Sequence, residues 1–164
     1  MKAEKQNVYA WLREKTLLSL QEMSQSMCAN NGNDDIYARK EAAEGAARKV
    51  LIVNDEDFMR IALRFQLKKL GGVQVFEACG VSDAMRIFEG QRIDVVIADI
   101  NLGDFTQDGY DLLRHIKERR VATKVYMMSG MQKEDAWPRA RELGADGYIQ
   151  IPYEEEELKK FVMQ

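Results

Sequence analysis

The hydrophobic positions of residues 49–164 fall into five short apolar runs, which alternate with segments of helical periodicity. The runs are rich in β-branched and aromatic residues, and a continuous apolar run of this length is typical of a strand buried on both faces. The segments between them repeat apolar residues at three- and four-residue steps, which indicates amphipathic helices. We therefore predict strands at 49–53, 73–78, 93–98, 124–128 and 147–151, and helices at 57–70, 82–90, 110–120, a fourth that ends near 143–144, and 154–163.

Three residue signals refine these boundaries. Gly71-Gly72 should end the first of these helices, because glycine readily takes the backbone conformation found after a helix. Ser82 is a candidate N-cap for the second. Pro138 should start or kink the fourth helix and not lie in its interior, because proline cannot donate a helical hydrogen bond.

Strands and helices in strict alternation predict an α/β fold with a parallel sheet covered by helices on both faces. Crossover connections in such a sheet are right-handed. In open sheets of this kind, ligands bind beyond the carboxyl ends of the strands, where the strand order reverses.

The first 47 residues follow a different pattern. Residues 7–28 predict an amphipathic helix, 29–35 are a breaker-rich stop, and 36–48 form either a helix or a semi-rigid linker. The apolar stripe of the first helix consists of Val8, Leu12, Leu20, Met23 and Met27, with Trp11 alongside. We place the domain boundary near Arg48, which gives a helical extension (1–47) and an α/β domain (48–164). The stripe should pack on the α/β domain or pair with a copy of itself, with docking on a foreign partner close behind.

Composition narrows the function classes. The chain has 164 residues, 46% hydrophobic and 31% charged, with a net charge of −3. That balance gives no general attraction to nucleic acid or to an anionic membrane. Cys28 and Cys79 have neither metal-ligand nor disulfide spacing, so we expect free thiols in a reducing compartment. We find no signal peptide and no run near the roughly 18 apolar residues of a membrane span, and we expect a cytoplasmic protein.

The candidate chemistry lies at the predicted carboxyl ends of the strands. Asn54 and Asp55 follow the first strand, Asp99 ends the third, and Ser129-Gly130 end the fourth. Two carboxylates at one edge repel each other and raise their own pKa, a penalty that a divalent cation such as Mg²⁺ removes. A strand-end aspartate can act as a nucleophile and become an aspartyl phosphate. The Ser129 hydroxyl and the backbone of Gly130 could then bind the added phosphate oxygens.

Residues 48–164 resemble the receiver domain of two-component response regulators. The resemblance is carried by VLIVNDED, DVVIADINLGD, Asp108-Gly109, VYMMSG, LGADGYI and Ile151-Pro152. It implies a flavodoxin-like doubly wound (βα)5 sheet of strand order 2-1-3-4-5, with a cis peptide before Pro152.

The same resemblance implies roles for individual residues. Asp99 would be the phospho-acceptor, Asp55 a Mg²⁺ ligand, and the main-chain carbonyl of Asn101 would complete the metal shell. Ser129 would be the switch hydroxyl, and Tyr148 the aromatic whose rotamer reports the position of Ser129. Receivers of this kind take a phosphoryl group from a histidine kinase or phosphotransfer partner and present an altered surface on their last two strands and helices.

The chain departs from the family pattern at two site positions. Asn54 replaces the first of two acids, and could still hold a metal-bound water. Ile151 precedes Pro152 where the family usually has a lysine that pairs with the phosphate. Lys49, Lys124 and Lys133 are the candidates to replace that cation.

The loop at 100–109 is a third departure. It is two residues longer than usual and has Gly103 where proline is common. Asp104, Phe105 and Thr106 would therefore sit beside the acceptor and alter access to it.

These features lead to three hypotheses. The first is a stand-alone receiver, a stoichiometric phospho-acceptor and not an enzyme, which signals to an unknown downstream protein through protein contacts. The second is a pseudo-receiver that serves as a constitutive interaction module. The third is a Mg²⁺-dependent phosphohydrolase, disfavoured because Asn101 stands where such enzymes carry a second acid. His115, the only histidine, is a poor phosphodonor, so the phosphoryl group must come from another molecule.

Overall fold

The computed structural model describes residues 10–11, 13–14, 17, 47–103, 106–120 and 122–164. Strands and helices alternate along the α/β region as the hydrophobic pattern predicts. The strands are β1 (Arg48–Val53), β2 (Val73–Ala78), β3 (Val95–Asp99), β4 (Lys124–Ser129) and β5 (Gly147–Gln150). The helices are α3 (Asp57–Leu70), α4 (Val81–Gly90), α5 (Gly109–Arg119), α6 (Lys133–Glu142) and α7 (Glu155–Met163).

The five strands form one parallel sheet in the order β2-β1-β3-β4-β5. The order reverses between β1 and β3, whose register pairs Val53 with Ala98. The predicted fold class is therefore confirmed. The residues that follow these two strands must meet at one edge of the sheet, at the switch point where such folds bind ligands.

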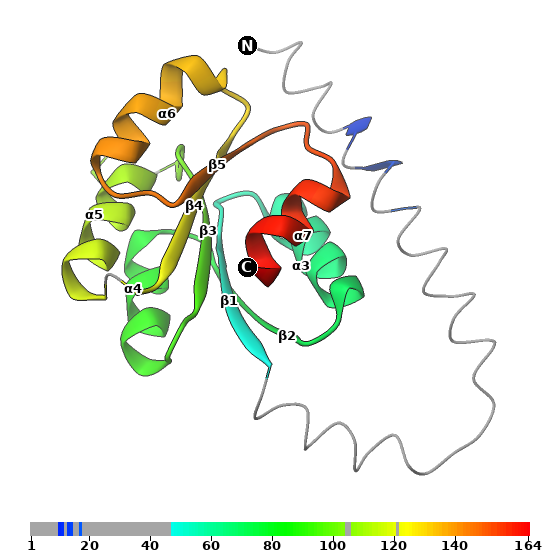
Figure 1. Cartoon of the computed structure of the whole chain (residues 1–164), viewed down its shortest axis with the longest axis horizontal. Coiled ribbons are helices and arrows are strands. Elements are labelled where there is room, and N and C mark those ends of the chain that lie inside the picture. The colour runs from blue at the N-terminus through cyan, green and yellow to red at the C-terminus, as the bar shows by residue number, and fades with distance from the viewer. Residues whose placement is uncertain (1–9, 12, 15–16, 18–46, 104–105, 121) are drawn as a thin grey trace.

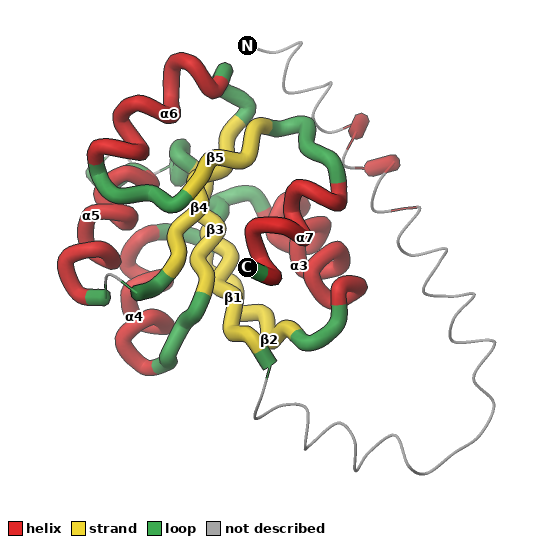
Figure 2. Tube along the Cα trace, viewed as in Figure 1, coloured by secondary structure: helices red, strands yellow, loops and turns green. Residues whose placement is uncertain are grey.

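Helices cover both faces of the sheet, as Figures 1 and 2 show, with α4, α5 and α6 on one side and α3 and α7 on the other. Each face has its own apolar cluster, because alternate strand residues point to opposite faces. Leu51, Val96 and Met127 belong to the first cluster, and Ile52 and Ile97 to the second. The strands are thus buried on both sides, which explains their continuous hydrophobic runs.

The β3 prediction began two residues too early. The Asp94 side chain accepts the N–H of Lys49 at 2.9 Å, and the carbonyl of Ile93 accepts the Thr123 hydroxyl at 3.0 Å. Side chains therefore satisfy backbone groups that a longer strand would have used. The regular register with β1 begins at Val95.

Two helix predictions were wrong in detail. Gly80, not Ser82, is the N-cap of α4, since its carbonyl accepts the N–H of Ala84 at 3.0 Å. Pro138 lies inside α6 and does not start it. Proline there removes the hydrogen bond to the carbonyl of Glu134. Both residues are exposed, so water can satisfy that carbonyl.

Among residues 1–46, the structure describes Ala10, Trp11, Arg13, Glu14 and Leu17, all helical. They agree with the helix predicted at 7–28, and the rest of that prediction and the segments at 29–46 lie outside the described residues. Within the described part of the chain, no helix is both long and apolar enough to cross a bilayer.

Candidate functional site

Asn54 and Asp99 meet at the carboxyl edge of the sheet, directly beyond the β1–β3 pairing. The Asn54 side-chain amide Nδ2 donates to Asp99 Oδ2 at 3.0 Å. Asn54 Oδ1 accepts the backbone N–H of Glu56 at 2.8 Å, which fixes the orientation of the amide. Asn54 is 1% exposed, so both hydrogen bonds are made by a buried side chain. An aspartate at this position would repel Asp99, whereas asparagine gives it a hydrogen bond.

The carboxyl group of Asp99 holds its proton more tightly than an exposed aspartate does. Burial raises the pKa of Asp99 to about 7, and the charges of Asp55 and Glu56 act in the same direction. Backbone N–H groups of Asn101 and Ile100 act in the opposite direction, and Asn101 N–H lies 3.1 Å from Asp99 Oδ1. Each carboxylate oxygen thus has one amide donor, while two nearby acids oppose its charge.

Asp55 lies close enough to Asp99 to affect its pKa, and the loop after β3 covers one side of Asp55. Gly103 has φ +62°, and a Cβ atom there would lie 2.5 Å from Asp55 Oδ2. The positive φ therefore favours glycine here, and a larger residue would also displace the exposed Asp55 carboxylate. This explains the glycine at a position where the family often has proline. The neighbouring Asp104 and Phe105, which we expected beside the acceptor, lie outside the described residues.

The return of this loop into α5 is also fixed against Asp99. A Cβ atom on Gly109 would lie 2.0 Å from the Asp99 carbonyl oxygen, so only glycine lets the helix start here. Asp108 caps the helix by accepting the N–H of Asp111 at 3.0 Å, and the Asp111 side chain accepts the N–H of Asp108 at 3.1 Å. The Asp108-Gly109 pair therefore holds the backbone around Asp99.

Ser129 at the end of β4 and Tyr148 in the neighbouring strand β5 come together near the carboxyl edge of the sheet. Ser129 is 2% exposed, and its Oγ accepts the N–H of Met131 at 3.3 Å. The Tyr148 hydroxyl donates to the Met131 carbonyl at 2.8 Å. Burial raises the pKa of Tyr148 to about 12, and a hydrogen bond with Ser129 partly offsets this. Tyr148 is buried in this arrangement, with its hydroxyl beside the predicted switch hydroxyl.

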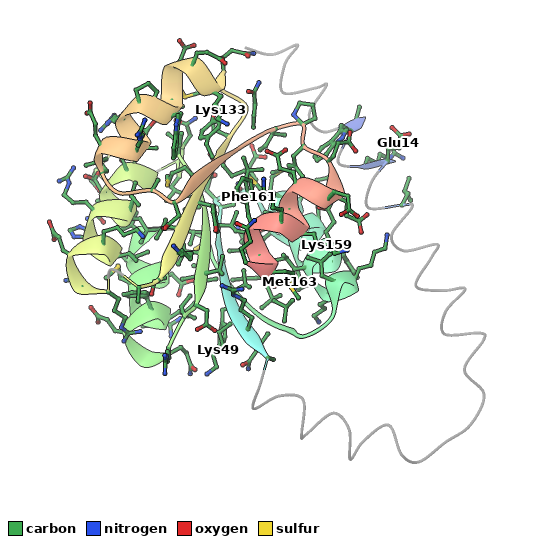
Figure 3. All side chains as sticks on the ribbon, viewed as in Figure 1. Glu14, Lys49, Lys133, Lys159, Phe161 and Met163 are labelled. Carbon is green, nitrogen blue, oxygen red and sulfur yellow. The ribbon has the colours of Figure 1, made fainter. Side chains whose placement is uncertain are left out.

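The Ile151 side chain is buried among apolar residues. It is 7% exposed and belongs to the apolar cluster under α3 and α7, and the peptide before Pro152 is cis. Of its suggested replacements, Lys49 bonds to Gln91 and Lys124 pairs with Asp146, both at the opposite edge of the sheet. Figure 3 places Lys49 at the far end of the molecule from Lys133. Lys49 and Lys124 are therefore wrong as substitutes. Lys133 lies at the correct edge, at the exposed start of α6.

Arg60 is a cation at this site that we did not predict. Its Nη1 donates to the Asn54 carbonyl at 2.7 Å, and its Nη2 pairs with Asp57. The side chain is only 15% exposed. Helical side chains point back toward the helix N-terminus, so a long side chain in the second turn of α3 reaches the end of β1. The position of this arginine near the start of a predicted helix was the signal in the sequence that could have identified it.

The two carboxylates at this edge fit Mg²⁺, but they do not fit a metal that needs three or more acidic ligands. Among the described residues, no group of three or more His, Cys, Asp and Glu side chains is arranged to hold a metal. Mg²⁺ is typically bound by one or two carboxylates together with waters and phosphate oxygens. Asp55 and Asp99 are two mutually repelling carboxylates, which is the chemistry that a hard cation relieves.

The comparisons with known proteins identify the family of the α/β domain. Residues 50–163 match the family model described as the response regulator receiver domain. The chain belongs to this family. Its members generally accept phosphoryl groups, bind Mg²⁺, and interact with histidine kinases or phosphotransfer proteins.

Solved structures show the same fold. A receiver domain protein from Clostridium thermocellum is 28% identical with a TM-score of 0.65, covering 71% of this chain and 91% of that one. The receiver domain of a histidine kinase from Syntrophus aciditrophicus is 26% identical with a TM-score of 0.63, covering 71% and 88%. A response regulator from Burkholderia pseudomallei with a phosphorylated aspartic acid and a calcium ion is 18% identical with a TM-score of 0.64, covering 70% and 66%.

Proposed function

We propose that this protein is a signalling receiver that accepts a phosphoryl group on Asp99 from a histidine kinase or phosphotransfer protein. The observation that carries the proposal is the placement of Asp99. It ends β3 at the switch point, with Asp55 beside it and one amide donor on each oxygen. The domain division at 1–47 and 48–164 and signalling through protein contacts to a downstream protein belong to the same proposal.

In the proposed reaction, one carboxylate oxygen of Asp99 attacks the phosphorus of a phosphohistidine. The new O–P bond forms as the P–N bond breaks, and the imidazole nitrogen keeps the electron pair and takes a proton. Asn54 and the Asn101 N–H hold the carboxylate in place by their hydrogen bonds. Orientation of this kind is a large part of catalysis in phosphoryl transfer.

Asp55, Asp99 and the main-chain carbonyl of Asn101 would hold Mg²⁺, with Asn54 contributing through a water. When bound, the ion would neutralise the charge that builds up between the carboxylates and the phosphoryl oxygens. The calcium ion and phosphorylated aspartic acid in the Burkholderia structure support this, in that the same fold can house both.

Ser129 is our proposed switch hydroxyl. It ends the strand next to β3, and Asp99 pairs with Met128 in the register. The hydroxyl accepts a long hydrogen bond of 3.3 Å from Met131 and also bonds to the Tyr148 hydroxyl, and it would exchange these contacts for a phosphoryl oxygen on turning toward Asp99. Tyr148, which bonds to both the Met131 carbonyl and the Ser129 hydroxyl, would follow that movement.

Arg60 is the residue that we propose in the place of the missing lysine, because it is a largely buried cation attached to Asn54. A guanidinium cannot be deprotonated, so its charge would be present at every physiological pH. We expect it to contribute less than a lysine would, since Asp57 already neutralises part of its charge.

A phosphorylation-independent interaction module is the second candidate. Two observations favour it: the burial of Ile151 in an apolar cluster, and the direct bond from Asn54 to Asp99 that already satisfies one carboxylate oxygen. In that case the same fold would present a constant surface.

The test is incubation with acetyl phosphate and Mg²⁺, followed by intact mass measurement. We expect a gain of one phosphoryl group that needs Mg²⁺ and is lost in Asp99→Asn. The matched control is Asp83→Asn, an acid in a surface pair with Arg86. An unmodified wild-type mass, together with no binding of beryllofluoride, would leave the interaction module as the better account. Repeated turnover of a phosphate ester would favour an enzyme.

A further inference from the structure

The seam between α3 and α7 carries an aromatic contact from outside the α/β region. Tyr153 follows the cis peptide, is 3% exposed, and donates its hydroxyl to Gln66 Oε1 at 2.7 Å. Gln66 is itself 4% exposed, so this buried bond joins α3 to the loop that precedes α7. Ile151 belongs to the same apolar cluster.

Trp11 of the N-terminal segment covers this seam. Its ring lies 4.8 Å from that of Tyr153 between centroids, at an interplanar angle of 72°. This edge-to-face geometry is one that aromatic pairs prefer. Figure 1 draws the described part of the segment, in blue, beside the β5–α7 loop. Trp11 also packs against the cluster that contains Ile151. Its neighbours Ala10, Arg13 and Glu14 are exposed, so the contact is made by Trp11 in particular.

The seam is joined to the acceptor edge by the backbone. The N–H of Ile151 donates to the Ser129 carbonyl at 2.9 Å. Ile151 and Tyr153 stand on either side of Pro152. A displacement of the Ser129 backbone toward Asp99 would therefore pull on Ile151 through one hydrogen bond, and Tyr153 follows two residues further along the chain.

We propose that this seam is the docking site of the chain's own N-terminal segment, held by Trp11, and that docking weakens when Asp99 carries a phosphoryl group. The apolar residue at position 151 is part of the device. An isoleucine there extends the apolar cluster that receives Trp11, whereas a lysine would bring a charge to it. The coupling rests on the proposed function, and the docking does not.

The consequence is an interaction surface with two states. With Trp11 docked, the seam is closed to other proteins. With the segment released, the seam becomes available to a partner helix. Because coupling between two sites is reciprocal, removing Trp11 must also change the affinity of the acceptor edge for its ligand.

Docking is tested by tryptophan fluorescence in the full chain. Trp137→Phe leaves Trp11 as the single tryptophan, because the sequence has two. We expect emission typical of a buried indole and protection from acrylamide, both independent of protein concentration. Emission like that of free tryptophan in water would overturn the docking. Protection that vanishes on dilution, with a dimer mass by light scattering, would instead assign the seam to a second copy.

Coupling is tested by adding beryllofluoride and Mg²⁺ to the same variant. We expect a red shift of Trp11 and loss of acrylamide protection. In the wild-type background, Trp11→Ala should tighten beryllofluoride binding about 2- to 10-fold, the factor that one aromatic pair contributes, and Trp11→Phe should change it less.

The outcomes separate the two claims. Binding of beryllofluoride with no change at Trp11, and equal affinity in Trp11→Ala, would overturn the coupling while the proposed function stands. No binding of beryllofluoride to any variant would overturn the coupling together with the proposed function, and the acrylamide result would still decide the docking. Unfolding of Trp11→Ala, monitored by circular dichroism, would contradict the assignment of Trp11 to a separable segment.

Discussion

Two aspartates at opposite ends of the sheet have opposite surroundings. At the amino edge, Asp146 accepts hydrogen bonds from Lys117 at 2.5 Å, Lys124 at 2.9 Å and the Val125 N–H at 2.9 Å. Burial acts to raise the pKa of Asp146, but these three donors lower it below the usual value. At the carboxyl edge, Asp99 has amide donors and two acidic neighbours, and its pKa rises to about 7.

We interpret this difference as that between a structural acid, Asp146, and the proposed phospho-acceptor, Asp99. A carboxylate surrounded by cations is stabilised in its charged form and ties elements together. A carboxylate held near other acids is costly until a cation binds to it, which is a signature of functional sites. Substitutions at one end of the sheet at a time can separate the two roles.

The largest expected effect is chemical. Asp99→Asn should abolish phosphorylation by acetyl phosphate, because the amide cannot act as the nucleophile. Asp146→Asn should leave the extent of phosphorylation unchanged when the protein is kept below its unfolding transition. Intact mass measurement on the two variants compares the ends of the sheet directly. A phosphorylated Asp99→Asn protein would place the acceptor elsewhere.

Protein stability should depend more on the acid at the amino edge, Asp146, than phosphorylation does. Asp146→Asn should lower the free energy of unfolding by about 2 to 3 kcal/mol, because it leaves the largely buried Lys117 ammonium without its carboxylate. Urea unfolding measures the change. The control Asp83→Asn breaks a surface pair with Arg86 and should cost less than about 0.5 kcal/mol. Equal losses in both variants would mean that Asp146 is no more than a surface acid.

The stability of the metal-free protein should also depend on pH through Asp99. Its pKa is higher in the folded state than in the unfolded chain, so the folded state binds more protons and loses stability as the pH rises toward 7. Asp99→Asn removes this loss, and should stabilise the protein at pH 8 by up to about 4 kcal/mol but little at pH 4. Thermal unfolding at the two pH values checks this. A variant that is less stable at pH 8 would show a net favourable environment for the charge.

Ile151→Lys would place a lysine at the carboxyl edge of the sheet. Asp146, at the opposite edge, already has two lysine partners. We expect beryllofluoride to bind about 10-fold more tightly, because a hydrogen bond to a charged group contributes roughly 1.5 kcal/mol or more. Ile151→Met, which keeps the apolar packing, is the control and should leave the affinity unchanged. Equal affinity in the lysine variant would show that its absence is not the limiting defect of the site.

The smallest effect concerns Arg60. Arg60→Gln should weaken beryllofluoride binding about 3-fold, since its charge is partly neutralised by Asp57 and exposed pairs contribute little. Arg64→Gln is the matched control on the same helix, because Arg64 pairs with Glu77 on β2. Titration calorimetry on both variants tests the difference. If the two arginines behave alike, Arg60 has no special part in the site.

Much of the fold could be predicted because local signals agreed with tertiary demands. The bounds of α3 and β2 are those expected, since Gly71-Gly72 separates a clear helical period from an apolar run. The meeting of Asp55 and Asp99 at one edge followed from the rule that parallel strands end together. The predicted start of β3 was wrong because side chains satisfy backbone groups there. The Asp94 side chain accepts the Lys49 N–H, and the Thr123 hydroxyl donates to the Ile93 carbonyl.

The finer parts of the site depend on side-chain directions that a pattern does not contain. The sequence predicts that Asn54 is near Asp99, but its direct hydrogen bond depends on the Glu56 N–H, which orients the amide. The apolar cluster in which Ile151 packs could not be predicted from the sequence either. Position 151 marks a missing cation in the family pattern, and only the packing places it in the cluster under Trp11.

The most direct test of the account is the titration of the Asp99 carboxyl carbon by NMR, with Asp99→Asn used for assignment. We expect a midpoint near pH 7 without metal and a midpoint well below that with saturating Mg²⁺. A midpoint near that of an exposed aspartate, unchanged by Mg²⁺, would contradict it.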